Sequence, residues 1–242
     1  MLNKKVNETN ELPILYSLRN CPFAMRARIA IFKTKQPIQL RDVVLSNKPQ
    51  AMLIVSPKAT VPVLIINHAD NNKKIEVIDE SLDIMLWALQ VRDPHNLLQQ
   101  ENPSAKDDML RIINTFDVEF KSCLEAYKCA KRYKEDNISE CRQACEIYIK
   151  VLEGFLSQHD FIFSNNESLV DIALLPFLRQ FARIERQWYL QSPYPKLRQW
   201  LNNYLQSPMF TKVMTKYPLW QENQEIVIFG DVYHHLSYSN RD

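Results

Sequence analysis

Asn20-Cys21-Pro22-Phe23-Ala24-Met25-Arg26-Ala27-Arg28 is the stretch that decides the fold of the first half of the chain. It follows an apolar run, residues 12–18, that is typical of a β-strand. Proline fits the first position of a helix because the N–H that it lacks would have no partner there, so Cys21 is expected to be the N-cap. The sulfur then faces free backbone N–H groups and the positive end of the helix dipole, which stabilise a thiolate, and Arg26 and Arg28 add positive charge nearby. A small buried cysteine is the alternative interpretation.

The residues that follow this stretch predict alternating strands and helices. In chain order we expect a helix from residue 22 to about 35, a strand at 39–45, a short helix after residue 49, strands at 61–66 and 75–78 joined by a polar turn at 68–74, and a helix that opens at residues 79–81. Together with the first strand, the order is β-α-β-α-β-β-α. This order matches the thioredoxin-like fold, an α/β class.

The second half of the chain predicts helices only. Residues 91–103 break the periodicity and indicate a linker. Beyond it, three pairs have the spacing of a helix-capping box: Ser104 with Asp107, Asn137 with Glu140, and Ser168 with Asp171. The last pair precedes a segment that is apolar on all sides, which belongs at the centre of an all-α helical bundle. From the cap alone we expect Asp171→Ala to lower the stability by about 1 to 2 kcal/mol.

The composition excludes several classes of protein. Lys and Arg number 30 against 28 Asp and Glu in 242 residues, so no overall field attracts nucleic acid or an anionic membrane. The chain has no run near the roughly 18 apolar residues of a membrane span, and its first residues are polar, so we expect neither a membrane span nor a secretory signal. We therefore expect a soluble protein in the cytoplasm.

The cysteines and glycines narrow the chemistry further. The five cysteines are scattered without a Cys-x-x-Cys pair, which argues against a disulfide framework and against a zinc site, so no metal is expected. Cys141 and Cys145 share one helical face and are explained as core residues. The chain has only two glycines, which excludes a glycine-rich phosphate loop.

Taken together, these motifs resemble the cytosolic glutathione transferase family, from residue 12 to roughly residue 220. The resemblance rests on Val61-Pro62 before the third strand, Glu80-Ser81 at the start of the third helix, and the Ser168 and Asp171 box. The Cys21-Pro22-Phe23 sequence is similar to the cysteine type, that is, to omega-class enzymes and their bacterial relatives. The expected domains are a thioredoxin-like, glutathione-binding domain at 11–91 and an all-helical domain at 104–222.

The resemblance implies roles for individual residues, with glutathione as the co-substrate. It makes Cys21 the catalytic nucleophile and Val61-Pro62 a cis peptide whose backbone pairs with the cysteinyl part of glutathione. It implies that Glu80 binds the γ-glutamyl ammonium group, that Ser81 binds the γ-glutamyl carboxylate, and that Lys48 binds the glycyl carboxylate. The implied glutathione-binding residues are Phe23, Lys48, Val61, Pro62, Glu80 and Ser81.

Three functions remain open at this point. The first is thiol transfer, including deglutathionylation and dehydroascorbate reduction, in which Cys21 forms a mixed disulfide with glutathione. The second is conjugation of glutathione to an electrophile by Tyr16 or Ser17, at the end of the first strand. The third is a non-catalytic binding platform that resembles the stringent-starvation proteins. The expected partner of glutathione is thus a glutathionylated thiol or a small electrophile.

Further expectations concern assembly and the pocket. The resemblance implies a homodimer. A pocket for the second substrate would lie beside Cys21, with Phe116, Phe120 or Tyr127 as either lining or core residues. The apolar segment 225–229 is expected to pack back onto the body of the protein, and the sequence assigns no role to the 225–242 tail.

Overall fold

The computed structural model describes residues 12–67, 75–220 and 226–230. The predicted turn at 68–74 and the tail beyond residue 230 therefore lie outside the described residues. The chain divides into two compact units, one with the residues up to Pro94 and those from Lys212 onward, and the other with His95–Thr211. Among the described helices, none has the length and apolar character that crossing a membrane requires.

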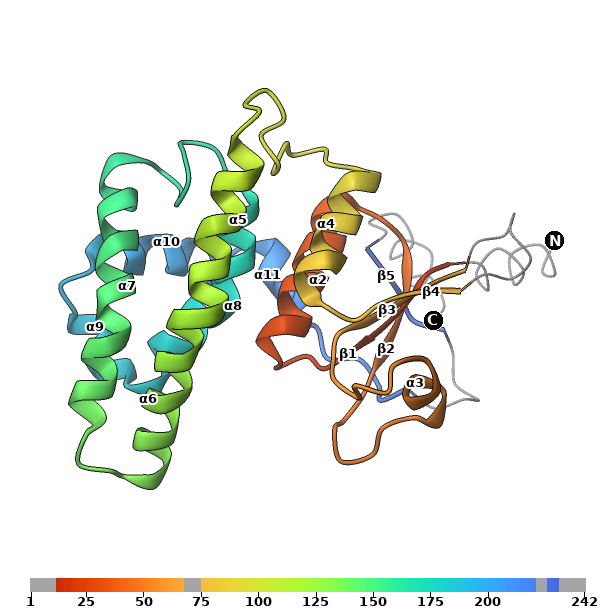
Figure 1. The fold of residues 1–242 in the computed structure, drawn as a ribbon, viewed down its shortest axis with the longest axis horizontal. Helices are drawn as coiled ribbons and strands as arrows, with labels where there is room; N and C mark the ends of the chain where they lie inside the picture. The colour runs from red at the N-terminus through yellow and green to blue at the C-terminus, as the bar shows by residue number, and fades with distance from the viewer. Residues whose placement is uncertain (1–11, 68–74, 221–225, 231–242) are drawn as a thin grey trace, which may run out of the picture. The chain divides into compact units, whose positions relative to one another are not determined.

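The first unit is built on a five-stranded sheet of order β4-β3-β1-β2-β5 (Figure 1). Strand β1 is parallel to β2 and antiparallel to β3, while β4 and β5 are antiparallel additions at the two edges. The strands are β1 (Ile14–Ser17), β2 (Ile38–Asp42), β3 (Val63–Asn67), β4 (Ile75–Ile78) and β5 (Ile228–Phe229). The helices are α2 (Pro22–Thr34), α3 (Gln50–Val55) and α4 (Ser81–Val91). This element order confirms the predicted thioredoxin-like topology.

The two faces of the sheet have separate cores. Helices α2 and α4 lie side by side along one face, and α3 covers the other (Figure 1). Because side chains alternate along a strand, Leu15 and Tyr16 of β1 point to opposite faces. Tyr16 joins a cluster on the α3 side whose buried members are Tyr16, Val43, Met52, Val61, Val63 and Ile65. We call these six residues the α3-side cluster.

The C-terminal segment belongs to the first unit. The predicted packing of 225–229 is confirmed, since Ile228 and Phe229 form β5 against Ile38 and Gln39 of β2. The described residues from Lys212 also fall in this unit, whereas the predicted helical domain extended to residue 222. The sequence could not show this difference because the partners of β5, on β2, lie about 190 residues earlier in the chain.

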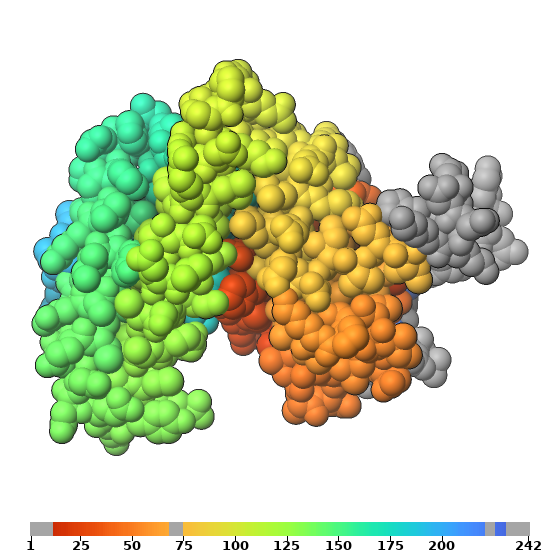
Figure 2. Space-filling view, in the orientation of Figure 1, coloured from red at the N-terminus to blue at the C-terminus, as the bar shows by residue number. Residues whose placement is uncertain are grey.

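The second unit is entirely helical, as predicted. Its helices are α5 (Ala105–Thr115), the π-helical turn η1 (Phe116–Phe120), α6 (Lys121–Tyr133), α7 (Ile138–Gln158), α8 (Leu169–Ile184), α9 (Arg186–Gln191), α10 (Pro195–Leu205) and α11 (Pro208–Val213), which begins here. Helix α8 is buried over most of its length and is largely hidden behind α5, α6 and α7 in the space-filling view (Figure 2). Its apolar sequence on all sides is explained by this central position.

Only one of the three predicted capping boxes forms. Asp171 accepts hydrogen bonds from the Ser168 backbone N–H at 3.0 Å and from its hydroxyl at 2.7 Å. Ser104 and Asn137 also precede their helices, but neither makes a side-chain bond to the helix start, so those two predictions are wrong. Both ends are exposed, and water can satisfy their N–H groups.

Candidate active site

Cys21 occupies the N-cap position of α2, as the sequence predicted. Its backbone is extended (φ −75°, ψ 125°), Pro22 is the first helical residue, and the Cys21 side chain makes no cap bond. The backbone N–H donates to the Leu18 carbonyl at 3.0 Å, and the Met25 N–H donates to the Cys21 carbonyl at 2.8 Å. The half-buried thiol is thereby fixed at the positive end of a 13-residue helix.

The structure brings Cys21 and Val61 together. The Val61-Pro62 peptide is cis. The Cys21 thiol donates to the Val61 carbonyl with an Sγ–O distance of 3.7 Å, across 40 residues of sequence. Pro62 is followed directly by β3, which places these backbone groups at the end of the sheet beside the start of α2.

Glu80 and Ser81 start helix α4 with different surroundings. Glu80 is the N-cap, and its carboxylate pairs with Lys58 and is 62% exposed. Ser81 is buried and accepts a hydrogen bond from Nε of Arg26 at 2.9 Å. The guanidinium of Arg26 lies 5.3 Å from the centre of the Phe23 ring, so Phe23, Arg26 and Ser81 form one group. The sequence analysis missed Lys58 and the link between Arg26 and Ser81, because no local pattern signals either contact.

Lys48 stands apart from these residues. It is half-buried in the loop before α3. No hydrogen bond or ion pair that the described residues form joins it to Cys21, Val61 or Ser81. Its assignment to a glycyl carboxylate therefore stays a prediction from the family resemblance.

Arg28 is a buried structural residue and not a charge beside the thiol. Its side chain is fully buried and donates from Nε to the Ser17 hydroxyl at 2.7 Å and from Nη2 to Asp42 at 2.6 Å. Burial lowers the pKa of Arg28, and burial raises the pKa of Asp42 against the effect of the guanidinium. The short, charge-assisted contact keeps this pair together inside the unit. The charge of Arg28, which the sequence predicted to lie near Cys21, is thus paired with Asp42.

The two hydroxyls proposed for conjugation chemistry are both buried and both bonded. Tyr16 is 0% exposed, and its hydroxyl accepts a hydrogen bond from Arg41 at 2.7 Å. Ser17 is also 0% exposed and accepts from Arg28. Neither side chain presents its oxygen at the surface of the unit.

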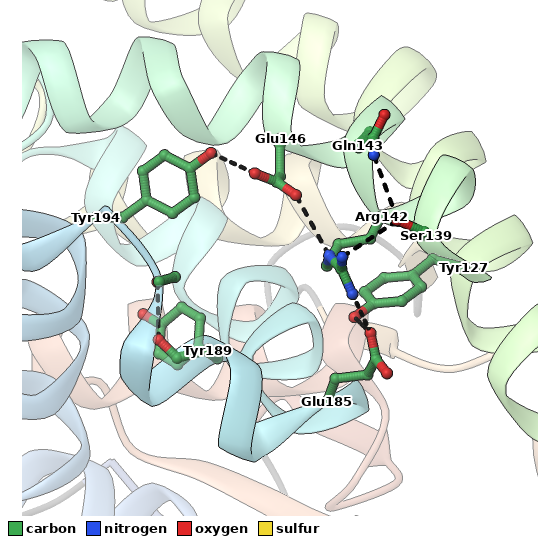
Figure 3. Close-up of polar contacts among 9 residues, drawn as sticks. Tyr127, Ser139, Arg142, Gln143, Glu146, Glu185, Tyr189 and Tyr194 are labelled. Carbon is green, nitrogen blue, oxygen red and sulfur yellow. Dashed lines mark hydrogen bonds and ion pairs between the residues drawn. The ribbon is translucent and has the colours of Figure 1, made fainter.

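The aromatic residues considered for a pocket are core residues of the helical unit. Phe116, Phe120 and Tyr127 are exposed by 5%, 0% and 0%, and Phe120 packs on Phe181 at 6.2 Å between ring centres. The Tyr127 hydroxyl donates to Glu185 at 2.9 Å (Figure 3). The sequence left open whether these three residues line a pocket or belong to the core, and within this unit they are core residues.

Glu185, between α8 and α9, is the centre of a polar network. Besides Tyr127, it accepts from Arg142 at 2.6 Å (Figure 3). It also accepts from Lys131 at 3.1 Å, and the Arg142 guanidinium lies 4.5 Å from the Trp188 ring centre. Burial alone would raise the pKa of Glu185, but these hydrogen bonds lower it overall. The network connects α6, α7 and α9 and is structural in character.

The remaining cysteines differ in accessibility. Cys145 is buried, and burial raises the pKa of its thiol to about 12, whereas Cys129 is exposed. Cys123 and Cys141 are half-buried. Within the described ranges, no three His, Cys, Asp or Glu side chains are grouped as a metal site would require.

Comparison with known proteins identifies the family. Residues 15–95 match the family model described as glutathione S-transferase, N-terminal domain, and residues 135–203 match the C-terminal domain of the same family. Glutathione S-transferase omega-1 of Mus musculus is 26% identical over 196 residues, which are 81% of this chain and 77% of the mouse protein.

Solved structures agree in fold. A glutathione transferase from Pseudomonas putida has a TM-score of 0.74 at 16% identity, covering 89% of this chain and 96% of that one. Glutathione transferase Omega 2C from Trametes versicolor has a TM-score of 0.67 at 19% identity, covering 84% and 93%. The chain therefore belongs to the glutathione S-transferase family and is a glutathione transferase enzyme, as the sequence predicted.

Proposed function

We propose that this protein is a glutathione-dependent thiol transferase with Cys21 as its nucleophile. The Cys21 thiolate attacks the glutathionyl sulfur of a mixed disulfide, the S–S bond of the substrate breaks, and the substrate leaves as a thiolate that takes up a proton. A glutathione thiolate then attacks the Cys21-glutathione disulfide, which releases glutathione disulfide and restores the Cys21 thiolate. The net reaction consumes one free glutathione, because the other half of the glutathione disulfide is the glutathionyl group that the substrate brought.

The contact between the Cys21 thiol and the Val61 carbonyl, 3.7 Å apart, carries this proposal. A glutathione backbone that paired with Val61 would bring its own sulfur to the neighbourhood of Cys21. Exchange needs the two sulfurs in contact, and the thiol at the N-terminus of α2 lies beside the Val61 carbonyl, where it could meet the sulfur of a bound glutathione. No second cysteine is needed, since glutathione itself resolves the intermediate.

The ends of glutathione have matching groups in the first unit. Ser81 accepts from Arg26, which leaves its O–H free to donate to the γ-glutamyl carboxylate at the start of α4. The exposed Glu80 carboxylate suits the ammonium group, which would join or displace Lys58. Phe23, Pro62 and Lys48 complete the proposed site by family resemblance. The related Pseudomonas putida structure holds one glutathione disulfide per subunit, which supports this disulfide as a ligand here.

Conjugation by Tyr16 or Ser17 is the less favoured function. A hydroxyl that stabilises glutathione thiolate has to reach it, and both oxygens are buried and already accept a hydrogen bond from an arginine. Deglutathionylation and conjugation are separated by comparing a mixed glutathione disulfide with an aryl halide as substrates of one preparation.

Intact-protein mass spectrometry with glutathione disulfide tests the proposal. We expect one glutathione adduct, mapped by peptide analysis to Cys21 and absent from Cys21→Ser. Cys129→Ser is the matched control, since it removes an exposed thiol outside the proposed site and should keep the adduct. An adduct that persists in Cys21→Ser would overturn the proposal. A parent protein that forms no adduct would also overturn it and would favour a binding platform.

The family also suggests a cytoplasmic homodimer. Light scattering coupled to size-exclusion chromatography tests this part: a mass of twice 28.6 kDa is expected, and a monomer at all concentrations contradicts it.

A further inference from the structure

Trp220 of the C-terminal segment forms a stack with two residues of the sheet. Its ring meets the Tyr16 ring edge to face, with 5.9 Å between centres and an angle of 89°. The Arg41 guanidinium lies 4.4 Å from the Trp220 ring centre and 5.3 Å from that of Tyr16, and its Nη1 donates to the Tyr16 hydroxyl at 2.7 Å. Edge-to-face and cation–π contacts both have preferred geometries, so each ring constrains the other two groups.

This stack is continuous with the proposed glutathione clamp. Trp220 and Cys21 both pack against the α3-side cluster, which includes Tyr16 and Val61. Tyr16 is paired with Val63 in the antiparallel register of β1 and β3. Val63 directly follows Pro62, so a shift of Tyr16 would displace the Val61 backbone through Val63 and Pro62.

The main chain holds Trp220 at a defined place. Its backbone N–H donates to the Asp42 carbonyl at 2.8 Å. Asp42 is itself fixed by its buried ion pair with Arg28. Upstream in the same segment, the Met214 carbonyl accepts from Arg19 at 3.5 Å. The Trp220 ring therefore packs on the sheet from a segment that hydrogen bonds hold at several points. We expect that no neighbouring side chain replaces the ring when it is removed.

We propose that Trp220 is a positioning residue that holds Tyr16 and, through β3, the Val61 backbone in the geometry that binds glutathione. This inference rests on the proposed function, because glutathione recognition is its readout. Trp220 acts through Tyr16 and does not contact the reacting sulfur in this scheme. Tyr16, the rival candidate for catalysis, becomes part of the same support.

The physical reason is the narrow tolerance of a backbone hydrogen-bond pair. Such bonds require donor–acceptor distances of about 2.7–3.2 Å and weaken when the angle departs from linear. Without the Trp220 ring, Tyr16 loses its edge contact and the Arg41 guanidinium is opened to water. Small displacements of a binding group, on the order of 1 Å, can lower rates about 100-fold. The backbone hydrogen bonds of Cys21 at the start of α2, with Leu18 and Met25, do not involve Trp220, so the position of the thiol at the helix N-terminus is kept.

The test compares two reactions of Cys21 in the same protein. Formation of the mixed disulfide is followed against glutathione disulfide concentration, and alkylation is followed with iodoacetamide, which does not use the clamp. For Trp220→Ala we expect the half-saturating glutathione disulfide concentration to rise on the order of 10- to 100-fold. The alkylation rate of Cys21 should change by less than about twofold, since the environment at the start of α2 is unchanged.

Three further variants make the result decisive. Trp220→Phe keeps an aromatic edge and should recover most of the affinity for glutathione disulfide. Leu219→Ala is the matched control, because the neighbouring Leu219 side chain is 48% exposed and should behave as the parent. If Trp220→Ala does not fold, Arg41→Met removes the guanidinium from the same stack. It should weaken the reaction with glutathione disulfide and leave the alkylation rate of Cys21 almost unchanged. Far-UV circular dichroism of every variant reports whether the protein is still folded.

The outcomes distinguish the two proposals. A parent protein without a Cys21 adduct overturns the proposed function. A parent that reacts, with Trp220→Ala and Arg41→Met both binding glutathione disulfide as the parent does, overturns the positioning role alone. A parallel loss of both reactions in a variant whose circular dichroism matches that of the parent shows that Trp220 supports the thiol itself and not the clamp, and it also contradicts the positioning role.

Discussion

Replacing Asp171 by alanine should destabilise the helical unit more than an ordinary capping residue would. Asp171 is 0% exposed and accepts four hydrogen bonds: from the Ser168 N–H at 3.0 Å, the Ser168 hydroxyl at 2.7 Å, the Ile162 N–H at 2.9 Å and the Trp200 indole N–H at 3.0 Å. Burial raises its pKa to about 6, so the carboxylate is still mainly ionised at pH 7. The side chain thus joins the start of α8 to α10 and to the preceding loop.

The magnitude follows from the donors that the variant would leave buried. The Ser168 hydroxyl can rotate to another acceptor, but the other three donors are fixed by the backbone or by an aromatic ring. A buried donor without a partner costs about 1 kcal/mol or more, so Asp171→Ala should lower the free energy of unfolding at pH 7 by about 3 to 5 kcal/mol. This exceeds the value of about 1 to 2 kcal/mol that the cap alone predicts. In a chain of this size the melting temperature should fall by roughly 10 °C.

Urea unfolding followed by far-UV circular dichroism measures this effect. Asp107→Ala is the matched control, because the exposed Asp107 stands at the same position in the first turn of α5, where no capping box forms. Its loss should cost about 0.5 kcal/mol or less. If Asp171→Ala and Asp107→Ala lowered the free energy of unfolding equally, the cost could not be assigned to the buried donors that Asp171→Ala leaves without an acceptor.

Further predictions concern the sheet edge, a strained loop and the polar network. Gly230 has φ +92°, and a Cβ there would lie 2.0 Å from the Gln36 carbonyl oxygen, so Gly230→Ala should detach β5 and speed amide hydrogen exchange in β2. Ala59 has φ 55°, so Ala59→Gly should raise the free energy of unfolding by up to about 1 kcal/mol in urea titrations. The hydrogen bonds that lower the pKa of Glu185 stabilise the fold at pH values above 4.5, the ordinary pKa of the group. This stability is lost as the pH falls through the lower pKa of the folded protein, so Glu185→Gln should flatten the acid side of a plot of unfolding free energy against pH.

Local sequence signals predicted the parts of the fold that depend on neighbours in the chain. Cys21-Pro22 marks a helix start because proline and the N-cap act within two residues, and the helix begins there. The Ser168 and Asp171 pair predicts its own hydrogen bonds because donor and acceptor lie three residues apart. The order of strands and helices along the chain followed from runs of β-branched residues and from helical periodicity, and the first unit has that order with one strand added.

The same spacing failed at Ser104 and Asn137 for a physical reason. A capping side chain is needed where water cannot reach the helix end, and these two ends are exposed. The hydroxyl of Ser104 donates to Asn102 at 3.1 Å instead. Sequence spacing identifies where a helix begins, but burial decides whether the side chain caps it, and burial is a property of the packed unit.

The chemistry of the candidate site depends on contacts that local sequence does not contain. Tyr16 follows the pattern of a tyrosine that activates glutathione, and only Arg41 and Trp220 reveal its engagement in packing. Trp220 lies 204 residues beyond Tyr16 in a segment that sequence periodicity placed with the helices. The C-terminal segment packs on the Tyr16 side of the sheet and buries Tyr16 completely, whereas Cys21 is half-buried. This difference in burial favours Cys21 as the nucleophile of the proposed function.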